Sequence, residues 1–277
     1  MAKERDDLTG IEIELLLEGV ARVYGYDFTG YAEASLRRRM LQWLANSPFS
    51  SFAEAQSRLL REPPLFEELL RGLTVNVSEM FRDPWVFRAI RELVVPHLKT
   101  YPFVKVWVAG CSTGEEAYSL AILLREEGLA GHYRIYATDL NPYVLEKAKE
   151  GVLPLREMRR YTGNYQKSGG RSSFSDYYTA GYDRALLDPS LREEIVFASH
   201  NLGVDAAFGE MQLVLCRNVL IYFKQQLKGR VLTLLDSCVP PGGFLCLGTK
   251  ETLDGYPQGP HYQEVEPQTR IYRKRYD

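Results

Sequence analysis

Residues 8 to about 73 carry hydrophobic positions at helical spacing and no convincing strand pattern. The segment IEIELLLEGVARVYG predicts a helix that Gly25 ends, with a buried face formed by Ile13, Leu16, Leu17 and Val20. A second helix, SLRRRMLQWLANS, directs inward Leu36, Met40 and Trp43 or Leu44. SFAEAQSRLLRE begins with a serine at a plausible cap, and PPLFEELLRGL begins with prolines that suit a first turn. We therefore predict a small N-terminal all-α domain of about four helices over residues 1–75.

From about residue 86 the pattern changes to alternating strands and helices. The predicted strands are VKVWVAG, YRIYATDL, EIVFASHNL, MQLVLCRNVLIYF, GGFLCLGTKETL and RIYRKRY. EIVFASHNL and MQLVLCRNVLIYF are each predicted to be a buried strand. The predicted helices are WVFRAIRELVVPHL, which Pro96 ends, EEAYSLAILLREEG, YVLEKAKEG and QQLKGRVLTLLDSCV. Such alternation is typical of parallel βαβ units. For residues 76–277 we predict an α/β fold, a Rossmann-like doubly wound sheet with helices on both faces.

Residues 156–190 interrupt that rhythm with a polar, glycine-containing stretch that is too long for a normal α/β connection. It forms either a small inserted subdomain or a mobile loop. Many of the 18 tyrosines cluster between residues 161 and 182, which favours an ordered piece with a partly exposed, sheet-like or recognition surface.

Composition narrows the class of protein without changing the predicted fold. The chain is 45% hydrophobic and 25% charged, and its net charge of -2 argues against a general nucleic-acid binder. The four cysteines and four histidines form no ligand pattern, so we expect no metal site. The amino terminus has no apolar signal-peptide region, and no apolar stretch approaches the ~20 residues of a membrane helix. We expect a cytoplasmic protein that does not insert into a membrane.

The stretch VWVAGCSTGEEAYSLAILL, residues 106–124, reads as a buried strand, a glycine turn and a helix. Gly110 and Gly114 do not fit the dinucleotide fingerprint G-x-G-x-x-G. Glu115 and Glu116 stand at the helix N-terminus, where a pyrophosphate would bind, and two unit charges about 4 Å apart interact by roughly 4 kcal/mol near a protein surface. These acids therefore disfavour a phosphate and favour a cation, although they could also serve only the helix dipole.

S-adenosylmethionine is a nucleoside ligand with a sulfonium and an ammonium but no phosphate. The next strand ends in YATDL, which places Asp139 where an acid can accept hydrogen bonds from ribose hydroxyls. Together with the unusual glycine spacing, this residue makes S-adenosylmethionine the predicted cofactor, with S-adenosylhomocysteine as the product.

Six segments in order resemble the CheR family of chemotaxis receptor methyltransferases. They are NVSEMFRD (76–83), AGCSTGEEAYSLA (109–121), YATDLNPYVLEKAKEG (136–151), HNL (200–202), CRNVLIYF (216–223) and GGFLCLGTKETL (242–253). STGEE-x-YS and CRNVLIYF in one chain make a highly specific pair, and the resemblance runs from the helical domain to near the carboxyl terminus. It implies methyl esterification of glutamate side chains on chemoreceptors.

The resemblance implies roles for individual residues. From the interdomain linker, the cofactor-binding residues are expected to be Asn76, Ser78 and Arg82. Glu116 is expected at the methionyl ammonium, with Glu115 as the weaker alternative, and Asp139 at the ribose. Asn201 and Leu202 are expected beside the adenine, and the remaining cofactor-binding residues are Gly110, Arg217 and Asn218. Tyr222 matches the family's active-site tyrosine. The basic run Arg37, Arg38 and Arg39 is expected to face the acidic, glutamate-bearing helix of a receptor. Residues 156–190 stand where some members carry a small β insertion that grips a receptor peptide, but SFSDYYTAGYD is unlike that insertion.

The implied chemistry suits these residue types. A glutamate carboxylate is already ionised at neutral pH, so the reaction needs alignment and exclusion of water rather than a strong base. Arg82 can hold one carboxylate oxygen, and Tyr222 can orient the acceptor, so we assign both as catalytic.

Bland alternatives stand beside these roles. Arg82 could form a salt bridge with Asp83 or Glu79, and Tyr222 could pack at a strand end. Asn76 could be a turn or cap residue, Asn201 and Asn218 could satisfy turn backbone, and the arginine run could be a solvated face. At the level of the whole protein, the alternatives are a non-catalytic regulator that binds the cofactor and a methyltransferase that acts on a small molecule or another protein.

Overall fold

The computed structural model describes residues 2–276, with side chains from Leu8 onward, and divides the chain into two compact units. The first unit comprises Met1–Val75 and Tyr222–Lys228, and the second comprises Asn76–Ile221 and Gly229–Asp277. The hydrophobic pattern predicts a change of fold near residue 75 but gives no indication that a later segment belongs with the helices. Among the described residues, no helix combines the length and the apolar character of a membrane span.

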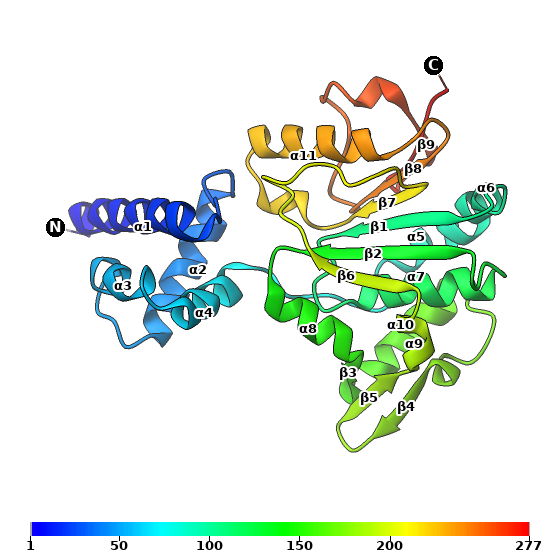
Figure 1. The fold of residues 1–277 in the computed structure, drawn as a ribbon, viewed down its shortest axis with the longest axis horizontal. Helices are drawn as coiled ribbons and strands as arrows, with labels where there is room; N and C mark the ends of the chain where they lie inside the picture. Colours follow the sequence, from blue (N-terminus) through cyan, green and yellow to red (C-terminus); the bar gives the residue numbers. More distant parts are fainter. Residues whose placement is uncertain (1, 277) are drawn as a thin grey trace. The chain divides into compact units, whose positions relative to one another are not determined.

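The first unit is helical, as predicted (Figure 1). Its helices are α1 (Ala2–Tyr24), α2 (Glu33–Asn46), α3 (Phe52–Leu59) and α4 (Pro63–Leu73). The inward positions predicted on the first two helices are buried: Ile13, Leu16, Leu17, Val20, Leu36, Met40 and Trp43. Ser51 caps α3, because its side chain accepts a hydrogen bond from the Glu54 backbone at 3.2 Å.

In the described part of the second unit, a seven-stranded sheet has the order β6-β2-β1-β7-β8-β10-β9 (Figure 1). Its strands are β1 (Val104–Ala109), β2 (Tyr133–Asp139), β6 (Ile195–Ser199), β7 (Leu213–Cys216), β8 (Phe244–Leu247), β9 (Tyr262–Glu266) and β10 (Ile271–Lys274). The strands from β6 to β8 are parallel, whereas β10 runs antiparallel to both of its neighbours. The predicted α/β fold is confirmed.

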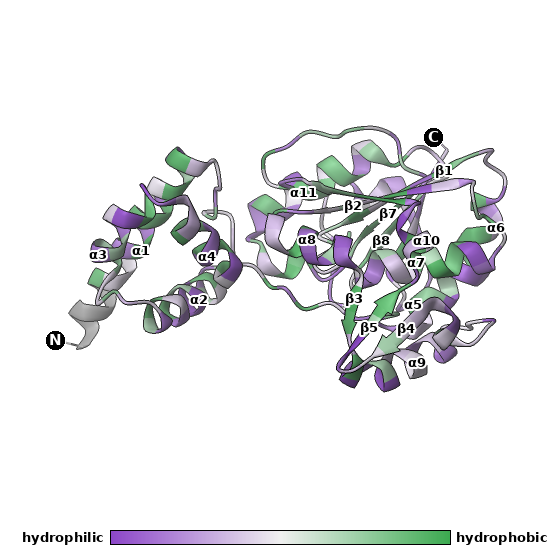
Figure 2. Ribbon diagram, turned by 60° about the horizontal axis from the view of Figure 1, so that its bottom comes forward, coloured by the Kyte–Doolittle hydropathy of each residue, from purple (hydrophilic) through white to green (hydrophobic). Residues whose placement is uncertain are grey.

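Helices connect and cover these strands. They are α5 (Pro84–Ala89), a π-helical turn (Ile90–Val94), α6 (Val95–Leu98), α7 (Glu115–Glu126), α8 (Pro142–Glu150), α9 (Met158–Lys167), α10 (Pro189–Arg192) and α11 (Gln225–Cys238). Short 3-10 turns cover Leu155–Glu157, Phe174–Tyr177, Leu220–Tyr222 and Gly259–His261. Figure 2 shows hydrophobic residues concentrated in the central strands β7 and β8 and polar residues on α8.

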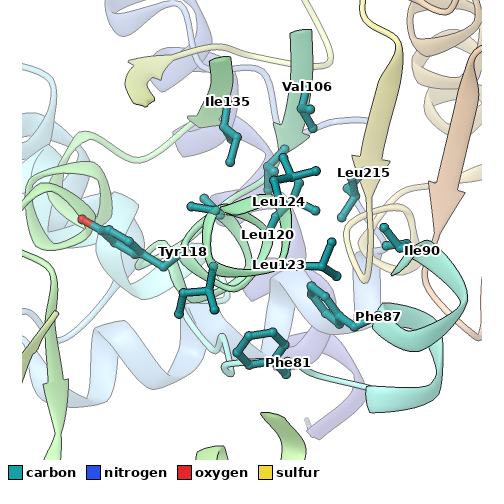
Figure 3. Close-up of a cluster of buried hydrophobic side chains, with 14 of the residues drawn as sticks. Phe81, Phe87, Ile90, Val106, Tyr118, Leu120, Leu123, Leu124, Ile135 and Leu215 are labelled. Carbon is teal, nitrogen blue, oxygen red and sulfur yellow. The ribbon is translucent and has the colours of Figure 1, made fainter. Parts of the chain in front are cut away.

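The core of this unit forms where α7 packs on the sheet (Figure 3). Leu120 and Leu124 of α7 point toward side chains from three parallel strands, namely Val106, Ile135 and Leu215, and Leu123 points toward Phe87. The other side of α7 is covered by Phe81, Phe87 and Ile90. Because both flanks of α7 are buried, the position of its first turn is fixed by packing.

Three local predictions are wrong. Pro96 does not end its helix: it lies in the first turn of α6, after a π-helical turn closed by a bond from the Val95 N–H to the Ile90 carbonyl. EIVFASHNL is not a fully buried strand, because β6 lies at the sheet edge and leaves side chains such as Val196 exposed. MQLVLCRNVLIYF is not one strand, because β7 ends at Cys216 and residues 220–222 form a 3-10 turn.

The insertion is ordered and contains a helix as well as a small β-sheet. Its strands β4 (Tyr178–Gly181) and β5 (Arg184–Leu187) pair antiparallel, and β5 also pairs antiparallel with β3 (Val152–Pro154), which lies just before the insertion. Tyr161 and Tyr165 of α9 are buried in the main core, so part of the tyrosine cluster serves packing and not the predicted recognition surface.

A buried ion cluster connects the insertion to the main fold. The Arg91 guanidinium lies 2.7 Å from both Glu126 and Glu127, and all three side chains are at most 5% exposed. From the insertion, Tyr165 and Tyr177 donate hydrogen bonds to Glu126, and Arg171 lies 2.8 Å from Glu127. The end of α7, the π-helical turn and the insertion therefore share one set of buried charges.

Replacing Arg91 with methionine is expected to lower the free energy of unfolding by about 3–5 kcal/mol, because two buried carboxylates lose their shared partner. Urea denaturation followed by circular dichroism measures the change. Lys147→Met removes one half of an exposed pair with Glu150 and should change stability by less than about 1 kcal/mol. If both substitutions lowered the free energy of unfolding equally, the ion cluster around Arg91 would not behave as a buried one.

The same cluster makes stability depend on acid pH. Burial raises the pKa of Glu126, but hydrogen bonds from Tyr165, Tyr177 and Arg91 outweigh it, so the pKa lies below its usual value of 4.5. The stabilisation is therefore present above about pH 4.5 and is lost as the pH falls through the lowered pKa. Glu126→Gln should be less stable than the parent at pH 7, and the gap should narrow toward pH 3 in urea titrations. A gap that is constant with pH would exclude this linkage.

Candidate functional site

The carboxyl ends of β1, β2, β6 and β7 meet at one edge of the parallel sheet. Ala109 of β1 pairs with Thr138 of β2, and Asp139 pairs with Ser199 of β6. This edge therefore collects most of the residues predicted to bind the cofactor: Gly110, Glu116, Asp139, Asn201, Leu202, Arg217 and Asn218. Sequence order reverses here, since β2 and β7 flank β1, and open α/β sheets bind ligands at such a point.

The glycine turn has the tight backbone that its sequence predicts, and packing within the protein is part of the reason. Gly110 and Gly114 have φ values of 76° and 92°, which disfavour any side chain. A Cβ at Gly110 would lie 2.5 Å from Cγ2 of Val219, so this glycine makes room for the loop after β7, and its predicted contact with the cofactor remains a prediction. Ser112, also at positive φ, has a buried hydroxyl that lacks a hydrogen-bond partner among the described residues. That hydroxyl is available to a ligand in the turn.

Asp139 fixes the turn through its backbone. Its carboxylate accepts hydrogen bonds from the Ser112 N–H at 2.9 Å and from the Asn141 N–H at 3.0 Å. Burial raises the pKa of Asp139, and these backbone donors oppose that shift. The predicted ribose acid therefore already has a structural task, which the sequence alone did not indicate.

Arg217 is the central charged residue of the edge. Its side chain is fully buried, with one nitrogen 2.6 Å from Glu116 and another 2.8 Å from Asp83. It also donates to the Arg82 carbonyl at 3.2 Å. Burial lowers the pKa of Arg217, but Glu116 and Asp83 oppose this and the net shift is upward.

The charge of Glu116 is partly compensated, because Arg217 pairs with it. The neighbouring Glu115 is buried and accepts a hydrogen bond from the Thr113 hydroxyl at 2.7 Å. Two carboxylates share the one guanidinium of Arg217, so the trio of Asp83, Arg217 and Glu116 keeps one net negative charge. The remaining charge therefore still favours a cationic ligand, but less strongly than two unpaired carboxylates would.

Arg82 makes neither of the salt bridges considered from the sequence. Asp83 pairs with Arg217, and Glu79 bonds to Asn164 at 2.6 Å and lies 3.6 Å from Arg160. Among the described residues, the half-buried Arg82 guanidinium has no ion-pair or hydrogen-bond partner. Its backbone is nevertheless held beside Glu116 by Arg217. The side chain is thus available for an anion.

The remaining predicted contacts are positioned by turns. The Asn201 side chain accepts the Gly203 N–H at 2.9 Å, and Leu202 is buried. Asn218 adopts a φ of 60°, and its N–H donates to Glu251 at 2.9 Å. The Asn201 side chain therefore satisfies turn backbone, which was its bland alternative, whereas Asn218 takes part in its turn through its backbone. The cofactor contacts of both asparagines remain predictions.

Sequence reasoning missed Glu251, although it lies in the quoted motif GGFLCLGTKETL. Its buried carboxylate accepts backbone hydrogen bonds from Gly248, Asn218 and Ile221 at 2.6, 2.9 and 3.2 Å. It also missed Asp83, the second partner of Arg217. An acid inside an apolar, glycine-containing motif is the signal that could have indicated Glu251.

The other predicted site residues lie in the first unit or in the segment before α5. Tyr222 and Arg37, Arg38 and Arg39 belong to the first unit, where Arg38 is exposed and Arg39 contacts the Tyr222 ring. Asn76 and Ser78 lie in the irregular segment before α5, and their cofactor contacts remain predictions. Among the described residues, no three His, Cys, Asp or Glu side chains converge as a metal site would require.

A parallel sheet with a glycine turn after its first strand and an acid at the end of its second strand is the arrangement expected of an S-adenosylmethionine-dependent methyltransferase. Comparison with known families agrees. Residues 76–270 match the CheR methyltransferase SAM-binding domain, and residues 11–74 match the CheR methyltransferase all-alpha domain. The chain belongs to the CheR methyltransferase family, and its second unit is an S-adenosylmethionine-binding domain.

Relatives match both units. Cher3 of Pseudomonas putida is 48% identical over 99% of this chain and all of its own length. The chemotaxis protein methyltransferase of Listeria innocua is 31% identical over 84% of this chain and 87% of its own. Chemotaxis protein methyltransferase 1 of Pseudomonas aeruginosa is 32% identical over 73% and 74%. A solved glycopeptide N-methyltransferase, MtfA, is 10% identical over 62% of this chain and 50% of its own, with a TM-score of 0.38.

Replacing Asp139 with alanine is expected to weaken S-adenosylhomocysteine binding and also to lower the free energy of unfolding by about 1–3 kcal/mol, because two backbone donors lose their acceptor. Calorimetry and urea denaturation measure the two effects. Asp183→Ala, at an exposed turn, should leave both within about 0.5 kcal/mol. Unchanged stability would contradict the structural task of Asp139, and unchanged affinity would remove it from the cofactor site.

Proposed function

We propose that the protein transfers a methyl group from S-adenosylmethionine to glutamate side chains of chemoreceptors or related signalling proteins. The products are a glutamate 5-O-methyl ester and S-adenosylhomocysteine. Relatives named chemotaxis protein methyltransferases support this substrate class, since they align with most of the chain. The observation that carries the proposal is the available guanidinium of Arg82, anchored next to the Arg217 cluster.

The chemistry requires positioning more than proton transfer. When bound, the cofactor supplies an electrophilic methyl carbon. One oxygen of the acceptor carboxylate forms the new bond to that carbon, the carbon–sulfur bond breaks, and its electron pair stays on sulfur. No proton moves, because the carboxylate is ionised at neutral pH. The proposed reaction therefore needs no side chain that acts as a general base.

We assign Arg82 to hold the second oxygen of the acceptor by a charge-assisted hydrogen bond. Tyr222 orients the acceptor through its hydroxyl, which has no hydrogen-bond partner among the described residues. Ser112, Glu116 and Asp139 hold the cofactor, with Glu116 facing its ammonium. Arg38, which is exposed on α2, steers an acidic receptor helix, since exposed charges mainly affect association.

The decisive experiment incubates the protein with methyl-labelled cofactor and membranes that contain chemoreceptors. Label that alkali releases as methanol is the expected result. Label that resists alkali would assign the methyl group to nitrogen or carbon of another acceptor. No label, with normal S-adenosylhomocysteine binding, would favour the alternative of a non-catalytic regulator.

Arg82→Ala should lower kcat/KM for the receptor by roughly 10- to 100-fold, which corresponds to the loss of a charged hydrogen bond of about 1.5–3 kcal/mol. Arg88→Ala is the matched control, because Arg88 is exposed on α5, a few residues further along the chain. It should retain parental activity. If the two variants behave alike, Arg82 does not contact the acceptor.

A further inference from the structure

Arg39 and Tyr222 are in direct contact inside the first unit. The centre of the Arg39 guanidinium lies 5.1 Å from the centroid of the Tyr222 ring, which is within the range of a cation–π interaction. The same guanidinium donates a hydrogen bond at 2.6 Å to the carbonyl of Leu73, at the end of α4. Arg39 is half-buried, and both of its contacts are intramolecular.

The backbone around Tyr222 is fixed to the same unit. The Ala32 N–H donates to the Tyr222 carbonyl at 2.8 Å, and the Lys224 N–H donates to the Gly30 carbonyl at 2.7 Å. Between these bonds, Tyr31 and Phe223 form a β-bridge with their rings 5.0 Å apart. The backbone of Tyr222 is therefore held by the loop before α2, which leaves its ring position to be set by side-chain contacts.

Arg39 differs from its neighbours in the basic run. Consecutive residues of a helix point about 100° apart, so three successive arginines cannot face one ligand. Arg38 is exposed, whereas the planar Arg39 group covers an aromatic face. A guanidinium that stacks on a ring and bonds a carbonyl at once uses geometry that lysine does not offer.

We infer that Arg39 is a positioning residue: it holds the Tyr222 ring in place and does not contact the acceptor directly. This inference deepens the proposed function, on which it rests, because it assigns the helical unit a part in placing the active-site tyrosine. It also separates the basic run into Arg38, which faces outward, and Arg39, which acts through Tyr222.

The test compares Arg39→Ala, Arg39→Lys and Arg38→Ala in the full chain. The first readout is the ring resonance of Tyr222 in protein labelled with 13C-tyrosine, assigned by its absence from Tyr222→Phe. The second is kcat and KM for receptor membranes at low and high salt. The third is the affinity for S-adenosylhomocysteine. Arg39→Lys keeps the charge, so it remains informative if the alanine variant folds poorly.

Arg39→Ala should shift the Tyr222 resonance and lower kcat by about 5- to 30-fold, the range of a lost cation–π contact, with little change in KM or cofactor affinity. Arg39→Lys should recover only part of kcat, because lysine cannot keep both contacts. Arg38→Ala should leave the resonance in place and raise KM in a salt-dependent way.

Two results would overturn the inference. One is an unmoved Tyr222 resonance in Arg39→Ala. The other is an unchanged kcat with a raised KM that Arg39→Lys restores, which would assign Arg39 to acceptor binding by charge. Failure of the proposed function looks different: the parent protein would transfer no methyl group, while the resonance would still report the contact between the two side chains.

Discussion

The buried guanidinium of Arg217 is the interaction on which the cofactor edge depends. A fully buried charge is tolerated only when it is paired, and the partners Glu116 and Asp83 come from the first turn of α7 and from the residue just before α5. One side chain thereby fixes the loop after β7 relative to both. Because the trio retains one negative charge, the same arrangement favours a cationic ligand, and among the described residues it leaves the adjacent Arg82 side chain without a partner.

Backbone strain is concentrated around this group. Phe81, Asp83, Ser112 and Asn218 have φ values between 51° and 60°, a region that costs non-glycine residues of order 1–3 kcal/mol each. Each is held by a side chain: Ser119 accepts the Phe81 N–H, Asp139 that of Ser112 and Glu251 that of Asn218, while Arg217 binds the Asp83 carboxylate. Strained loops with dedicated supports are typical of preorganised sites, which is what a reaction without a general base requires.

How well the sequence predicts these features depends on how far apart in the chain the interacting residues lie. Helical periodicity placed Leu16 and Met40 in the core, and local rules found the Ser51 cap, because both depend on residues a few positions apart. The pairing of Glu116 with Arg217 spans 101 residues and leaves no trace in either motif. The association of Tyr222 with the helical unit was hidden for a similar reason, since MQLVLCRNVLIYF reads as one buried strand. Its break comes from Asn218 at positive φ, which Glu251 holds from a distant loop.

Gly110 and Asp139 show that a sequence motif can identify the correct ligand even when the role first given to each residue is incomplete. The missing Cβ of Gly110 makes room for Val219, and Asp139, which was expected to bind ribose, first binds the turn itself. Both residues shape the edge that receives the cofactor. A motif can therefore identify the ligand even where its residues act by supporting the site. In such a site, loss of binding in a variant does not by itself prove contact. Stability must be measured beside affinity, because a residue that supports the loop changes both quantities, whereas one that only touches the ligand changes affinity alone.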